Sequence, residues 1–433
     1  MPLDLKYGSS FGHSPNSTDL EASLEKTAKW WKNWISKCTY HGPGADAVER
    51  SLITLKALTY NPTGGILAAA TTSLPEEFGG KRNWDYRYCW LRDATFSLLA
   101  LVHAGYHEEA RRWRDWLLRA AAGSADQMQI MYGVAAERRI PEREIPWLPG
   151  YKGASPVRIG NAAAEQLQLD IYGEIADALH QAPKGSEAKS EPTRNLQREL
   201  LRHLQDIWRE PDHGIWEVRG PTRHFTHSKV MAWVAFDRAI KDCQSSGADG
   251  DLDRWRATRQ EIHDDACRRG FDAELGTFVQ SYGSKQLDAS LLLIPLVGFL
   301  PPSDPRIAGT IRQIERRLIR DGLVMRYDTE KSEDGLPSGE GAFLACSLWL
   351  ADAYHLLGQN DKARDLLERV LRLRNDVGLL SEEYDPEEKR FAGNFPQAFS
   401  HVGLVNTIIN LNMPTGPARQ RSGSHGHSPK PPL

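Results

Sequence analysis

The strongest constraint on the fold is a regular change in character from one helical segment to the next. After an amphipathic segment at 18–37, twelve further helices are expected, at 46–59, 91–105, 107–122, 162–181, 192–209, 228–243, 251–269, 287–299, 305–320, 340–357, 360–374 and 398–411. Some segments, such as 91–105 and 340–357, are apolar on nearly all sides. Others, such as 305–320 and 360–374, carry one apolar stripe beside a charged face.

A helix that is apolar on all sides is buried, whereas a helix with one apolar stripe covers a surface. Alternation of the two kinds predicts an all-α protein in which six inner helices are wrapped by six outer helices, an (α/α)6 toroid. A repeat solenoid is the competing architecture, but no self-similarity recurs at a period of about 20 to 50 residues. We expect a linker and helix at 1–44, the toroid at 45–412 and a disordered, low-complexity tail at 413–433.

The overall composition argues against several classes of protein. Lys and Arg total 54 and Asp and Glu total 57, for a net charge of −3, so the basic excess of a nucleic-acid-binding protein is missing. No apolar run reaches the roughly 18 residues of a membrane span, and no signal peptide is visible. The five scattered cysteines indicate a reducing compartment, so a cytoplasmic location is expected. The oligomeric state stays open.

The loops that lead into the inner helices have an unusual composition. They lie at 82–93, 146–161, 213–229, 280–288, 334–341 and 381–401, and a toroid gathers them at one rim. Four of the 13 tryptophans fall in them: Trp84, Trp90, Trp147 and Trp216. Aromatic rings can stack on sugars, and arginine and aspartate can bind hydroxyl groups. Glutamates in two separate loops could supply the carboxyl pair of a glycoside hydrolase. From the residues alone, a sugar site and simple loop packing both remain open.

Several long motifs resemble one known family. They are ALTYNPTGGILAAATTSLPEEFGGKRNWDYRYCWLRDATF at 57–96, PWLPGYKGASPVRIGNAAAEQLQLDIYGE at 146–174 and EGAFLACSLWLADAYHLLG at 340–358, followed by GLLSEEYDP and AFSHVGLVN. Together they resemble glycoside hydrolase family 15, which includes glucoamylases, glucodextranases and microbial trehalases. The resemblance covers roughly 45–412. It implies an (α/α)6 barrel, inverting hydrolysis of an α-glucosidic bond with release of β-glucose, and no metal or organic cofactor.

The resemblance also implies catalytic roles. The family's general acid is a glutamate that follows a tryptophan, which points to Glu217 in GIWEVRG; Glu174 in LDIYGE is the alternative. The general base precedes an aromatic–serine pair, which points to Glu382, with Glu383 as its polar neighbour. Inversion requires the two carboxyl groups to lie about 6.5–9.5 Å apart, with room for a water molecule.

The remaining site residues are expected to bind sugar. Trp90, Arg92 and Asp93 resemble the residues that hold the glucose at the non-reducing end. Further substrate contacts are expected from Trp84, Trp147, Trp216, Glu383, Arg219 and His401.

The substrate and the activity are open to three interpretations. The motifs place trehalose first and α-1,4-linked gluco-oligosaccharides second. Many members carry a β-sandwich domain ahead of the barrel, whereas about 45 residues precede it in this sequence. A barrel without a complete sandwich domain could instead be an inactive sugar-binding protein.

Overall fold

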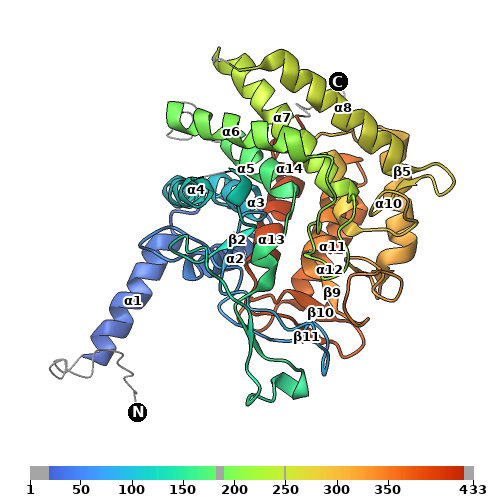
Figure 1. Ribbon diagram of the computed structural model, residues 1–433. Helices are drawn as coiled ribbons and strands as arrows, with labels where there is room; N and C mark the ends of the chain where they lie inside the picture. The colour runs from blue at the N-terminus through green and yellow to red at the C-terminus, as the bar shows by residue number, and fades with distance from the viewer. Residues whose placement is uncertain (1–18, 124, 182–189, 248–249, 424–433) are drawn as a thin grey trace, which may run out of the picture.

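The computed structural model describes residues 19–123, 125–181, 190–247 and 250–423, and within these ranges helices form two concentric layers (Figure 1). The inner helices are α3 (Ala94–His103), α5 (Asp170–His180), α7 (Thr226–Ser246), α9 (Leu293–Leu296), α11 (Leu344–Leu356) and α13 (Ala398–Asn412). The outer helices are α2 (Ala45–Ala57), α4 (His107–Ala121), α6 (Glu191–Ile207), α8 (Leu252–Arg269), α10 (Pro305–Leu318) and α12 (Asn360–Leu373).

Burial follows the two kinds of helix seen in the sequence. Every residue of α13 from Ala398 to Leu411 is buried, as expected for an inner helix. The outer helix α10 instead buries one stripe that includes Ile307, Ile311 and Ile314, because these residues recur at helical spacing. The last inner helix, α13, packs against α2 and α3 near the start of the chain and so closes the ring. The predicted (α/α)6 toroid is therefore confirmed.

Two inner segments are less regular than the sequence suggests. The helix expected at 287–299 is split into a 3-10 turn at Ala289–Leu292 and the short α9. Asp288 caps the turn by accepting from the Ser290 amide, Pro295 has no amide hydrogen to donate, and Gly298 takes a left-handed conformation after the helix. The helix expected at 162–181 begins with a 3-10 turn, and α5 itself starts at Asp170.

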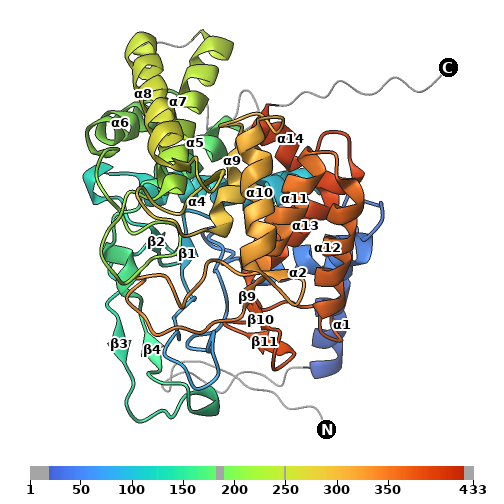
Figure 2. The same cartoon turned by 90° about the vertical axis from the view of Figure 1, so that its right-hand side faces the viewer.

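Short strands gather mainly in the loops at one end of the barrel (Figure 2). At this end β1 (Cys89–Trp90) pairs with β2 (Met131–Tyr132), and β3 (Arg143–Glu144) pairs with β4 (Arg158–Ile159) in a projecting hairpin. An antiparallel sheet joins β9 (Ala342–Phe343), β10 (Glu383–Asp385) and β11 (Arg390–Ala392), with Glu383 opposite Phe343. The remaining pairs are β5 (Phe271–Asp272) with β6 (Thr277–Phe278), and β7 (Ile319–Arg320) with β8 (Leu323–Val324).

The two ends of the described chain pack on the barrel differently. The leading helix α1 (Leu20–Ile35) is mostly exposed, but Trp34 is buried and donates to Glu109 at 2.7 Å. The short helix α14 (Pro417–Ser422) lies at the barrel end opposite the projecting hairpin (Figure 2). Within the described ranges, no helix combines the length and the apolar composition that a membrane span requires.

Helix α14 corrects the prediction of a disordered tail from residue 413. Arg421 is buried, its Nε donates to Asp177 Oδ2 at 2.7 Å, and its carbonyl accepts from Arg238. Arg421 pairs with a carboxylate in the barrel interior, and the low-complexity composition around it does not indicate this role. The prediction is wrong for 413–423, and residues 424–433 lie outside the described part.

Candidate active site

A cavity opens among the loops that lead into the inner helices. Its walls come from within 76–92, 216–219, 326–343 and 382–397, together with Asn161. About 580 Å³ of space lies between the lining atoms, including solvent at the mouth. Side chains from segments far apart in the sequence therefore meet at the rim that the helix alternation predicts.

Glu217 projects from the loop before α7 and lines this cavity. Its φ of +58° is a left-handed conformation that is uncommon outside glycine, so the loop holds the residue in a strained position. Its Oε1 accepts a hydrogen bond from Trp90 Nε1 at 2.7 Å and another from Arg92 Nη1 at 3.1 Å. Arg92 also donates to the Ile215 carbonyl at 2.8 Å, which ties the guanidinium to the same loop.

Glu382 lies deeper in the same cavity, just before β10. Only 1% of it is exposed, and Tyr86 donates its hydroxyl to Oε1 at 2.5 Å. Burial and the nearby Glu76 carboxylate raise the pKa of Glu382 to about 8, whereas Arg326 and the Tyr86 hydroxyl act in the opposite direction. The charged form of Glu382 therefore depends on these two partners.

Two neighbouring aromatic residues connect the carboxyl groups. Tyr86 bonds to Glu382 and Trp90 bonds to Glu217, and the two ring centroids lie 5.2 Å apart. One segment, 86–90, therefore positions both glutamates on one cavity. The expected spacing of an inverting pair stays a prediction.

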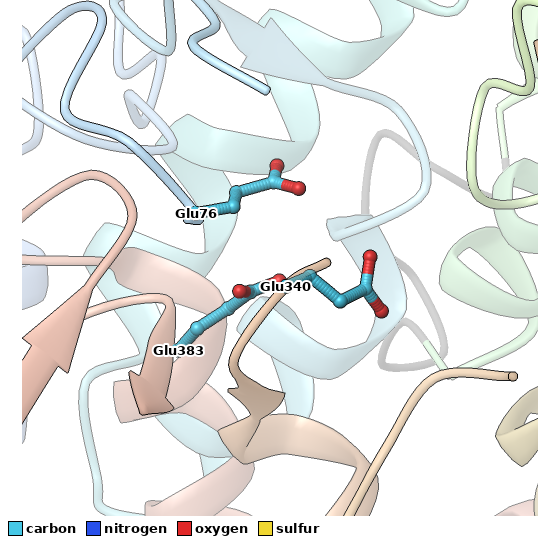
Figure 3. A group of neighbouring side chains, drawn as sticks. All are labelled: Glu76, Glu340 and Glu383. Atoms are coloured by element: carbon cyan, nitrogen blue, oxygen red, sulfur yellow. The ribbon is translucent and has the colours of Figure 1, made fainter. Parts of the chain in front are cut away.

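A second group of carboxylates surrounds an arginine beside this pair. Glu76 and Glu340 come from two separate loops and Glu383 from β10, and one carboxylate oxygen of each lies within 4.8 Å of the others, close enough to hold a metal ion (Figure 3). The guanidinium of Arg326 lies 2.7 Å from Glu76, 2.6 Å from Glu340 and 3.3 Å from Glu383, so the protein itself supplies a cation to all three. Arg82 adds a second positive charge 3.4 Å from Glu340.

This arginine-centred cluster leaves two buried oxygens without a hydrogen bond, although one of them, Glu383 Oε1, lies 3.3 Å from Arg326. Among the described residues, Glu76 Oε1 and Glu383 Oε1 have no hydrogen-bond donor. Burial raises the pKa of both carboxyl groups, and the neighbouring glutamates add to the effect. Glu76 and Glu340 were not among the residues predicted for the site, although both lie within the motifs at 57–96 and 340–358, and Arg326 was not predicted either.

The structure brings only some of the predicted sugar-binding residues to the cavity surface. Trp84, Trp216, Arg92 and Arg219 line it together with the two candidate catalytic glutamates. Trp90 supports Glu217 by its hydrogen bond, and Asp93 accepts from Arg92 at 3.1 Å.

Three further candidates lie away from the cavity lining, and so does Glu383, which belongs to the arginine-centred cluster. Trp147 lies between β3 and β4 and is 76% exposed. His401 is buried in α13, where it accepts from the Leu380 amide and contacts Ser51 Oγ. Glu174, the alternative acid, is buried in α5 at 3.6 Å from Arg421. Because Glu174 is buried away from the cavity that Glu217 lines, the structure favours Glu217 as the acid.

A family model described as glycosyl hydrolases family 15 matches residues 42–409. The chain belongs to this family. The curated relatives of this family 15 barrel include the trehalase of Mycobacterium tuberculosis, 43% identical over 408 residues, which are 92% of this chain and 59% of that protein. The trehalase of Mycolicibacterium smegmatis is 43% identical over 409 residues, which are 92% of this chain and 60% of that protein. The chain thus spans about three fifths of both relatives.

The fold is also shared with solved structures. A bacterial glucoamylase complexed with acarbose superposes with a TM-score of 0.67 at 14% identity, over 91% of this chain and 60% of the other. At this identity the likeness establishes the barrel fold alone.

Proposed function

We propose that this protein is an inverting α-glucoside hydrolase that cleaves trehalose. The observation that carries the proposal is the placement of Glu217 and Glu382 on one cavity by the adjacent Trp90 and Tyr86. Glycoside hydrolysis with inversion needs one carboxyl group that protonates the leaving oxygen and one that activates water. No other carboxyl role is required of the site.

Glu217 is the general acid in this proposal. Trp90 and Arg92 both bond to Oε1, so Oε2 is left to carry the proton to the glycosidic oxygen. The rigid contacts fix the direction of proton transfer, which is a requirement of general acid catalysis.

Glu382 is the general base. It takes a proton from water as the water attacks the anomeric carbon, and Tyr86 and Arg326 favour the charged form that this step needs. Arg92 and Asp93, joined at 3.1 Å, lie beside Glu217 and are the proposed partners of the hydroxyl groups of the bound glucose.

Trehalose is the proposed substrate because the two mycobacterial relatives at 43% identity are named trehalases. Hydrolysis of the α,α-1,1 bond with inversion gives one β-glucose and one α-glucose, because only the attacked anomeric carbon changes configuration. This stoichiometry separates inversion from retention, which would give α-glucose alone.

The test compares glucose release from trehalose, maltose and maltotriose by the purified chain. We expect trehalose to be hydrolysed most rapidly, and Glu217→Gln and Glu382→Gln to lower kcat by at least about a thousandfold with the fold intact. Glu174→Gln is the matched control, since this buried glutamate lies outside the cavity and should retain turnover. Faster hydrolysis of maltose would contradict the choice of trehalose. Absence of release from all three sugars by folded protein would contradict the enzymatic proposal.

A further inference from the structure

The mouth of the cavity carries a cluster of charged side chains around one tryptophan. The guanidinium carbons of Arg158 and Arg219 each lie 4.7 Å from the centre of the Trp84 ring. Glu142, next to β3, contacts both arginines: Arg219 Nη2 at 2.9 Å and Arg158 Nε at 3.6 Å. Trp84 is therefore occupied by arginines, which makes it a support for them instead of a stacking platform for sugar.

Arg219 is the member of this cluster that combines a fixed position with free donors. It follows Glu217 by two residues, lines the cavity, and its amide donates to the Asp334 carbonyl at 2.8 Å. Its side-chain bonds to Glu142 and to Asn161 Oδ1 both use Nη2. Within the described residues, Nε and Nη1 of Arg219 make no hydrogen bond and are available to a ligand.

The exposed fraction of the lining residues decreases from the mouth of the cavity to its floor. The side chain of Arg219 is 22% exposed and that of Glu217 is 15% exposed, whereas Glu382 is 1% exposed. In an inverting reaction, the base and its water act on the side of the anomeric carbon opposite the leaving group. The glucose that is attacked therefore lies deep near Glu382, and the leaving sugar extends past Glu217 toward Arg219.

We propose that Arg219, held in place by Trp84 and Glu142, binds the hydroxyl groups of the leaving glucose. This inference rests on the proposed function and assigns a second sugar subsite to the mouth of the same cavity. Nη1 carries two N–H donors that are held in the plane of the guanidinium and suit hydroxyl oxygens, whereas a lysine would supply the charge without this fixed plane. Arg219 is a substrate-binding residue in this proposal, and Trp84 and Glu142 are positioning residues.

The test uses two substrates that differ only in the leaving group. Trehalose places its leaving glucose at this subsite, whereas α-glucosyl fluoride releases a fluoride ion and has no second sugar. We expect Arg219→Ala to lower kcat/KM for trehalose by about 10- to 100-fold and to change kcat/KM for α-glucosyl fluoride less than about threefold. Arg219→Lys should give a smaller loss on trehalose alone. Arg143→Ala is the matched control and should change neither value, because Arg143 is an exposed arginine of β3 that follows Glu142.

The outcomes separate this inference from the proposed function. Equal decreases in kcat/KM on both substrates would contradict the proposed subsite and would mean that Arg219 acts by positioning Glu217. An unchanged kcat/KM for trehalose would also overturn it. A wild-type protein that is active on α-glucosyl fluoride but not on trehalose would contradict the trehalose substrate and the subsite together. Inactivity of the folded wild type on both substrates would contradict the hydrolase proposal itself.

Discussion

Replacing Tyr86 by phenylalanine removes the hydroxyl that donates to Glu382 while keeping the ring that packs on Trp90. The donor stabilises the charged carboxylate, so its loss raises the pKa of Glu382 further above the ordinary glutamate value. A hydrogen bond to a charged group contributes about 1.5–3 kcal/mol, and one pKa unit corresponds to about 1.4 kcal/mol. The expected increase is therefore about one to two units.

The assay is the pH dependence of kcat/KM for trehalose. A base must be ionised to act, so the acidic limb of the profile reports the ionisation of Glu382 and should move to higher pH by the same one to two units. Tyr327→Phe is the matched control, because Tyr327 lines the same cavity but donates to Asp334 at 2.8 Å. An acidic limb that stays in place in Tyr86→Phe, or moves equally in both variants, would refute the assignment of Glu382 as the base.

Two further substitutions test the packing of the site and of the barrel. In Gly393→Ala the new Cβ would lie 2.5 Å from Glu382 Oε2, so kcat should fall at least about tenfold; Gly358→Ala, with a similar positive φ and open space, should lose stability without loss of kcat. Equal kcat values in the two variants would contradict this reasoning. Arg421→Met breaks a buried ion pair with Asp177 and should destabilise the fold by about 3 kcal/mol. At roughly 2 cal/mol/K per residue the melting temperature of the whole chain should fall by about 3–4 °C, measured by calorimetry, and an unchanged value would show that α14 does not anchor the barrel.

The helical architecture could be predicted because the pattern of apolar residues in each helix indicates which of its faces are buried. The expected segment 107–122 corresponds to α4 at His107–Ala121, and 360–374 corresponds to α12 at Asn360–Leu373. Local periodicity fails where local chemistry interrupts a helix. The segment 287–299 is the example: its pattern predicts one inner helix, but it forms a 3-10 turn followed by the short α9, which contains Pro295 and ends before the left-handed Gly298.

The site was predictable only where a motif carries it. Glu217 and Glu382 stand in recognisable motifs, and the structure places both on one cavity. Arg326 lies 250 positions after Glu76, and its other two glutamate partners also come from separate segments, so no local pattern indicates that the four residues meet. Arg421 was concealed in the same way, because its partner Asp177 lies 244 positions earlier.

Glu217 and Glu382 are proposed to form an inverting acid–base pair. Proton NMR of the first glucose released from trehalose distinguishes inversion from retention, because the two anomers have separate signals before they interconvert. We expect equal initial amounts of α-glucose and β-glucose from the wild-type protein, and at least about a thousandfold slower release from Glu217→Gln and Glu382→Gln. Initial release of α-glucose alone would mean retention and would contradict the assignment of the two roles.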